Sequence, residues 1–180
     1  MLKTLRQIGR IGIITESAPP VDDSMRVADA LQSQILAVMG RALCIRAVDA
    51  GSCNGCELEI HALNNPLYNL EGLGVRFVAS PRHADLLLVT GPVAKNMQAA
   101  LTLTYQATPD PKLVVAIGDC GCTGGIFGES YASLGRVSNV IPVDVTVPGC
   151  PPSPRRILSG ILTAISKAVP DNARLRSAQT

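Results

Sequence analysis

Three short segments of the sequence carry cysteines at positions where thiolates could bind a metal. Cys53 and Cys56 form a C-x-x-C pair, while Cys120 and Cys150 stand in two distant segments, each next to glycine. Two intervening residues let the chain turn and present both sulfurs to one centre, and four thiolates are the usual ligand set of a [4Fe–4S] cluster. The four cysteines therefore predict one iron–sulfur centre if the fold brings the segments together.

The same thiols leave other chemistries open. A Cys₄ zinc site would use the same four ligands, although zinc ribbons usually pair two C-x-x-C units and this chain has one. A dithiol redox site needs only the C-x-x-C pair and leaves the two distant cysteines unexplained. Cys122 could replace Cys120 as the third ligand, and Cys44 is expected to be a small buried apolar residue inside a strand.

Each cysteine segment follows an apolar run that has the pattern of a strand. Strands are expected at 43–48, 75–78, 84–90, 113–117 and 141–147, and helices at 25–39, 57–63, 94–106 and from Pro154 to about residue 165. Continuous apolar runs alternating with helices predict an α/β fold with a doubly wound parallel sheet. Loops after parallel strands gather at one edge of the sheet, so loops at the carboxyl ends of the strands are expected to hold the centre.

The 180 residues are expected to form one main domain. We expect an N-terminal arm and helix at 1–40, an iron–sulfur domain at 41–169 and a disordered tail at 170–180. Residues 123–139 are rich in glycine and serine and are expected to form a long functional loop.

The N-terminal arm carries a possible amphipathic helix. Leu2, Leu5 and Ile8 recur at three-residue spacing, and basic residues lie between them. Two hypotheses stay open for this helix, a solvated arm and an arm that contacts a partner or a membrane.

Composition excludes several classes of function. The net charge is +2 with no block of lysines and arginines, so nucleic-acid binding is not predicted. No window approaches 18 consecutive apolar residues, so no membrane span is predicted. A secretory signal is not predicted, and the expected compartment is the reducing cytoplasm, where a C-x-x-C is more often metal-binding or redox-active than disulfide-bonded.

Four separated segments resemble the small subunits of [NiFe] hydrogenases. They are GSCNGCELEI, SPRHADLLLVTGPV, AIGDCGCTGGIFGESY and IPVDVTVPGCPPSP, they occur in the family's order, and the resemblance covers roughly residues 40–165. The chain is most similar to the membrane-bound, energy-converting type, as in formate hydrogenlyase. The same superfamily includes the complex I subunit that carries the terminal iron–sulfur cluster.

The resemblance implies a flavodoxin-like fold that holds a single proximal [4Fe–4S] cluster on Cys53, Cys56, Cys120 and Cys150. It also implies an electron-transfer subunit without catalysis of its own. The implied partners are a [NiFe] large subunit or its nickel-free homologue, a ferredoxin-like iron–sulfur subunit and integral membrane subunits. The implied location is peripheral, on the cytoplasmic face of the inner membrane.

Two other functions remain as alternatives to the hydrogenase subunit. One is the cluster-bearing subunit of a complex I-like NADH or ferredoxin:quinone oxidoreductase, and the other is a zinc-stabilised binding module. Complex I relatives have two adjacent cysteines where this chain has Asn54-Gly55 between Cys53 and Cys56, which favours the hydrogenase side.

Three titratable residues near the motifs have open roles. Glu57 and Glu59 could lie on a proton path or on a solvated or salt-bridged helix face. His83 could couple proton uptake to reduction if it lay near the centre, since histidine is a common proton carrier in proteins. Otherwise His83 is a histidine at the start of a strand, and Arg82 beside it is expected to be an interface or surface cation.

Overall fold

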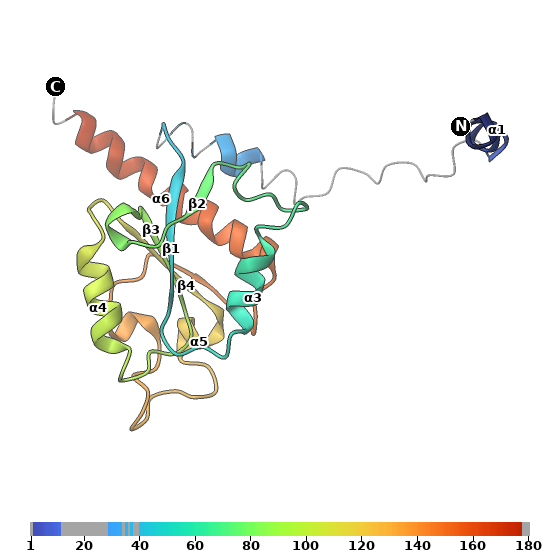
Figure 1. The fold of residues 1–180 in the computed structure, drawn as a ribbon. Helices are drawn as coiled ribbons and strands as arrows, with labels where there is room; N and C mark the ends of the chain where they lie inside the picture. The colour runs from blue at the N-terminus through green and yellow to red at the C-terminus, as the bar shows by residue number, and fades with distance from the viewer. Residues whose placement is uncertain (1, 12–28, 34, 36, 38–39, 178–180) are drawn as a thin grey trace.

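A parallel β-sheet forms the centre of the fold (Figure 1). The computed structural model describes residues 2–11, 29–33, 35, 37 and 40–177, and residues 1, 12–28, 34, 36, 38–39 and 178–180 are not described. The five strands are β1 (Leu43–Asp49), β2 (Val75–Phe77), β3 (Leu86–Thr90), β4 (Leu113–Ile117) and β5 (Val145–Val147). Their order is β2-β1-β3-β4-β5 and all pairs are parallel, which confirms the predicted doubly wound α/β fold and matches the flavodoxin-like strand order.

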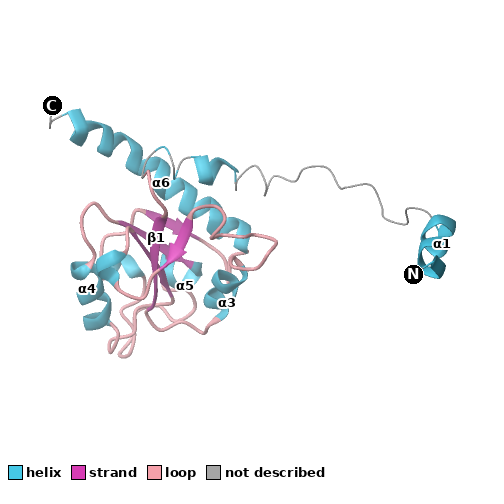
Figure 2. Ribbon diagram, turned by 45° about the horizontal axis from the view of Figure 1, so that its top comes forward, coloured by secondary structure: helices cyan, strands magenta, loops and turns pink. Residues whose placement is uncertain are grey.

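Helices cover both faces of the sheet, as Figure 2 shows. Successive residues of a strand point to opposite faces. Leu86 and Leu88 of β3 pack in one core cluster with α3 (Gly55–Ala62) and α6 (Pro154–Ser177), whereas Leu87 and Val89 pack in a second cluster with α4 (Gln98–Ala107). The strand is fully buried because both of its faces are covered, and each such leucine contributes roughly 1.5–3 kcal/mol through burial.

Two predicted elements begin four residues later than expected, each because its first residues lack the hydrogen bonds of the predicted element. Of the strand predicted at 141–147, only β5 has strand conformation. Pro142 has no N–H to donate, and the Val114 N–H donates to the Asp144 carboxylate at 2.7 Å and not to a backbone carbonyl of this segment. The helix predicted at 94–106 begins only at Gln98. The amide of Ala94 donates to Ala50 O, and that of Lys95 donates to Ala132 O.

The two ends of the chain also differ in part from expectation. Helix α6 continues to Ser177, so residues 170–177 are helical and not the disordered tail that was predicted. Alanine, arginine and leucine at 173–176 favour a helix, whereas the proline, aspartate and asparagine at 170–172 do not, so the sequence carries no clear signal for this extension. The helix predicted at 25–39 is present at residues 29–33, 35 and 37. Its other residues, 25–28, 34, 36 and 38–39, lie outside the described part of the chain.

The N-terminal region contains two helical parts. Leu31 and Ile35 belong to the same core cluster as β3, so this part of the predicted arm packs on the domain. The predicted amphipathic helix is confirmed as α1 (Leu2–Ile11). Within the described residues, no helix is both long and apolar enough to cross a bilayer.

Candidate metal centre

The carboxyl ends of four strands form one row, and the cysteine segments start from it. Asp49 of β1 is in register with Thr90 of β3, Thr90 with Ile117 of β4, and Ile117 with Val147 of β5. Parallel strands lie about 4.8 Å apart, so the whole row spans only roughly 15 Å. The segments with Cys53 and Cys56, with Cys120 and with Cys150 follow β1, β4 and β5, which brings all three to one edge as predicted.

Hydrogen bonds from Asp49 fix the first cysteine segment. Its Oδ1 accepts from the Gly51 N–H at 2.8 Å and from the Ser52 N–H at 2.7 Å. Such an Asx turn reverses the chain directly after the strand. Asn54 then adopts a left-handed conformation with φ 72°, and α3 starts at Gly55. Cys56 is therefore in the first turn of a helix and Cys53 in the turn before it, which differs from the all-loop geometry that was predicted.

Glu57 joins the first segment to the middle of the sheet edge. Its Oε2 accepts from the Ser52 hydroxyl at 2.5 Å, and its Oε1 accepts from the Thr90 hydroxyl. Thr90 is buried, with 1% of its surface exposed. Both carboxylate oxygens of Glu57 accept from hydroxyls, so Glu57 links the first segment to β3 and is not the solvated side chain that was considered, while a role on a proton path stays a hypothesis. Glu59 lies on the same helix, partly exposed, and its role stays open.

The second cysteine segment is a helix and not the predicted loop. Helix α5 (Gly118–Thr123) begins directly after β4 and contains Cys120 and Cys122. The Asp119 N–H donates to Gly149 O at 2.8 Å, and Asp119 Oδ1 accepts from the Gly149 N–H at 2.8 Å. These two reciprocal bonds connect the residue before Cys120 to the residue before Cys150, so they fix the second and third segments relative to each other.

Three glycines place bare backbone against three of the sulfurs. A methyl group on Gly118 would lie 2.7 Å from Cys56 Sγ, one on Gly125 would lie 2.8 Å from Cys120 Sγ, and one on Gly55 would lie 3.6 Å from Cys53 Sγ. The first two distances are shorter than a side chain tolerates. The sulfurs thus lie in a cradle in which backbone comes close and no β-carbon intervenes.

The four thiols are near enough to influence one another electrostatically. Burial raises the pKa of Cys56 to about 12, and the charge of Glu57 and the thiolates of Cys53, Cys120 and Cys150 contribute after it. The pKa of Cys120 is also raised, by burial first and then by the charges of Cys150 and Cys53. The structure therefore brings together the four cysteines that the sequence analysis singled out.

Cys122 lies outside this group. Burial raises its pKa to about 11, and among the described thiols only Cys120 contributes to that shift. Its Sγ donates to Ala116 O at 3.6 Å, so the thiol is directed at β4. Cys44 lies near the amino end of β1, away from the centre. It is partly exposed and not buried as predicted, since it alternates with the buried Leu43 and Ile45 and so points to the other side of the strand.

The environment of the thiols predicts a labelling order in the metal-free chain. We expect iodoacetamide to modify the exposed Cys53 and Cys150 before the buried Cys56, because the thiolate is the reactive form and the pKa of Cys56 is about 12. Below that pKa, labelling of Cys56 should accelerate about tenfold for each unit by which the pH is raised, since the thiolate fraction rises by that factor. Peptide mass spectrometry measures both effects, and equal labelling of Cys53 and Cys56 near neutral pH would contradict them.

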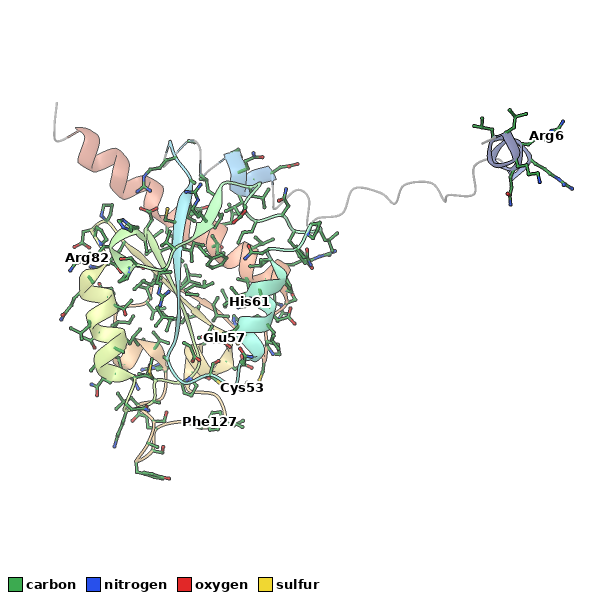
Figure 3. All side chains as sticks on the ribbon, viewed as in Figure 1. Arg6, Cys53, Glu57, His61, Arg82 and Phe127 are labelled. Carbon is green, nitrogen blue, oxygen red and sulfur yellow. The ribbon has the colours of Figure 1, made fainter. Side chains whose placement is uncertain are left out.

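His83 and Arg82 lie at the other edge of the sheet. They belong to η1 (Pro81–His83), which precedes the amino end of β3. The five residues of β3 separate this edge from the cysteines by roughly 17 Å. Figure 3 shows Arg82 well away from Cys53. His83 therefore does not contact the centre, so the condition under which it could couple proton uptake to reduction is not met.

Exposed apolar side chains occur beside the cysteine edge. The loop after α5 exposes 94% of Ile126, 55% of Phe127 and 92% of Tyr131, and Leu58 of α3 is 63% exposed. Figure 3 shows Phe127 and Cys53 at the same end of the domain. We name these four residues the apolar rim. Exposed apolar side chains that gather near a site are typical of a surface that another protein covers.

Four thiols are a donor set for either of the two metal centres that the sequence left open. Zinc would need all four sulfurs about 2.3 Å from one ion. Within the described residues, no group of three or more histidine, cysteine, aspartate or glutamate side chains is arranged to hold a single ion. The four cysteines at this edge supply the number and type of donors that a [4Fe–4S] cluster uses, one thiolate for each iron.

Comparison with known proteins gives a consistent family. Residues 53–164 match the family model of the NADH ubiquinone oxidoreductase 20 kDa subunit. The chain is 48% identical over 135 residues to a probable membrane-bound hydrogenase subunit, MbhJ, of Pyrococcus furiosus, which covers 75% of this chain and 81% of that protein.

Two further matches extend the comparison. Formate hydrogenlyase subunit 7 of Escherichia coli is 41% identical over 145 residues, 81% of this chain and 56% of that protein, so the chain spans little more than half of it. Among solved structures, a chain of the membrane-bound sulfane sulfur reductase, an archaeal respiratory membrane complex, aligns with a TM-score of 0.61 at 35% identity. That alignment covers 70% of each chain.

Proposed function

Because the chain belongs to the family of the NADH ubiquinone oxidoreductase 20 kDa subunit, we propose that it is the electron-transfer subunit of a membrane-associated oxidoreductase complex. In this proposal Cys53, Cys56, Cys120 and Cys150 bind a single [4Fe–4S] cluster. The bound cluster takes up and releases an electron, and so connects the active site of a large subunit with ferredoxin-like subunits.

The observation that carries the proposal is the convergence of four thiols from three distant segments at one sheet edge. Cys53, Cys120 and Cys150 all contribute to the raised pKa of Cys56, although up to 97 positions separate them (150 − 53). A chain of this size does not need cross-links to fold, so such convergence has no evident structural purpose. Close backbone at Gly118 and Gly125 supports a centre that is held rigidly and in which amides could donate to sulfides.

A [NiFe] hydrogenase is the complex that we favour. Two named relatives are hydrogenase-type subunits, and Asn54-Gly55 separates Cys53 from Cys56, unlike the adjacent pair of the complex I side. The nickel–iron site would belong to the large subunit, and the apolar rim would form part of the surface that this subunit covers. Integral membrane subunits would hold the complex at the cytoplasmic face of the inner membrane.

A complex without nickel is the second candidate. The matching family model is named for an NADH ubiquinone oxidoreductase subunit, and the aligned solved structure is a sulfane sulfur reductase. The metal content of the partner, and not of this chain, separates the two candidates. A zinc-stabilised binding module is less favoured, because the matching family and the named relatives are subunits of oxidoreductase complexes.

The test is anaerobic purification of the chain with its native partners, followed by metal analysis and EPR spectroscopy before and after dithionite. We expect about four irons per copy of this chain beyond those of the partner subunits, and a reduced-state signal that disappears in Cys53→Ala. Nickel in the complex would select the hydrogenase. A colourless chain that contains zinc and no iron would contradict the electron-transfer proposal.

A further inference from the structure

Helix α1 (Leu2–Ile11) has an apolar side that the described chain does not cover. Leu2 is 80% exposed and Leu5 is 66% exposed. In Figure 3, Arg6 projects from α1 with no side chain of the domain against it. A helix of ten residues is marginal in water by itself, so its apolar side needs a surface to bind.

The charges of α1 are of one sign and lie on one side. Lys3, Arg6 and Arg10 are its charged residues, and it contains no aspartate or glutamate. At about 100° per residue, these three positions fall within an arc of roughly 60° around the helix axis. Positions 2 and 5 fall roughly 70° and 130° from the middle of that arc and outside it, so the cations and the leucines occupy separate sectors of the helix surface.

This separation distinguishes between the surfaces that α1 could bind. A solvated helix is usually stabilised by pairs of opposite charge one turn apart, and α1 has none. A groove on a protein requires apolar contact but no uniform positive side. A bilayer with anionic headgroups requires both, because the leucines enter the interface while the cations stay among the phosphates.

We propose that α1 is an interfacial helix that binds an anionic lipid surface. It would lie in the plane of the bilayer, since ten residues measure only about 15 Å and cannot span it. Residues 12–28 follow it, and 17 residues (28 − 12 + 1) can reach at most roughly 60 Å. The helix can therefore bind lipid while the domain is bound to protein subunits. This inference does not depend on the proposed metal centre.

Vesicle binding of the full-length chain tests the proposal. The sequence contains no tryptophan, so Leu5→Trp introduces a single fluorescent reporter. We expect a blue shift of its emission with vesicles that contain phosphatidylglycerol and no shift with pure phosphatidylcholine. Sedimentation with the same vesicles measures binding of the unmodified chain. Raising the salt from roughly 50 mM to roughly 500 mM should release it, because screening shortens the reach of the charges.

Variants separate the contribution of α1 from that of the domain. Lys3→Gln/Arg6→Gln/Arg10→Gln should weaken binding to anionic vesicles about fivefold for each charge removed. The matched control is Arg76→Gln/Arg82→Gln/Lys95→Gln, which removes three exposed cations from the domain and leaves α1 unchanged. This variant should bind as the unmodified chain does.

Two results would overturn the proposal. One is an equal loss of binding in the control, which would assign the attraction to overall charge. The other is the absence of any sedimentation or blue shift with anionic vesicles, which would leave α1 as a protein-docking or solvated arm. Neither measurement involves iron, so failure of the metal-centre proposal would be recognised separately.

Discussion

Replacement of Cys120 by alanine is expected to remove the iron from the purified protein, whereas the same replacement of Cys122 should leave it in place. Both residues lie on α5, so the two variants are matched in residue type and in helix. Positions two apart on a helix point roughly 200° apart, and only one of them can face the other thiols. The charges of Cys150 and Cys53 act on Cys120, while the Cys122 thiol donates to Ala116 O.

The expected difference is large in iron content and small in stability. Loss of one ligand of four should lower the iron of this chain from about four atoms to nearly none. Loss of the Cys122 thiol removes one buried hydrogen bond and should lower the free energy of unfolding by about 1 kcal/mol. Metal analysis and the reduced-state EPR signal measure the first effect, and urea unfolding measures the second. Loss of iron in Cys122→Ala with retention in Cys120→Ala would exchange the two assignments.

The sheet could be predicted because its residues carry the information locally. Continuous apolar runs such as Leu86 to Thr90 are typical of strands buried on both faces, and the observed strand is buried throughout. The gathering of the cysteines at one edge followed from the parallel topology alone. The same topology explains why His83 is remote, because a residue that precedes a strand lies at the opposite edge.

The helical state of α5 could not be predicted from its own residues. The segment Gly118–Thr123 contains two glycines and an aspartate, which are poor helix formers. Its conformation depends on the reciprocal bonds between Asp119 and Gly149, which are 30 positions apart in the sequence. Contacts of that range overrule local propensity, and one sequence does not reveal them.

The polar residues that position the site were missed for a similar reason. Thr90 is the polar end of an apolar run, but its bond to Glu57 joins two segments 33 positions apart. Asp49 could have been found, since an aspartate at the end of a strand with glycine and serine two and three residues later is a turn signature. The sequence therefore predicted the chemistry of the thiols but not the hydrogen bonds that position them.

Gly118→Ala is expected to disrupt the site through backbone and packing together. Gly118 has φ +82°, where an L side chain is strained by about 1–2 kcal/mol. Its new methyl group would lie 2.7 Å from Cys56 Sγ and 3.4 Å from Gly149 O, and overpacking of this kind costs about 1–3 kcal/mol. The free energy of unfolding should therefore fall by roughly 2–5 kcal/mol. The iron content should fall as well, because Cys56 must move.

Gly128→Ala is the matched control for the backbone strain. Gly128 has φ +54°, and a methyl group there would meet no atom within 4 Å. In Gly128→Ala the free energy of unfolding should therefore fall only by the part that comes from backbone strain, and the chain should keep its iron. A second comparison isolates the contact with sulfur. If the methyl group acts through Cys56 Sγ, then Gly118→Ala should cost less stability in a Cys56→Ala background, where that atom is absent. An unchanged cost would mean that backbone strain alone disfavours alanine, and that the close approach of Gly118 is not what positions Cys56.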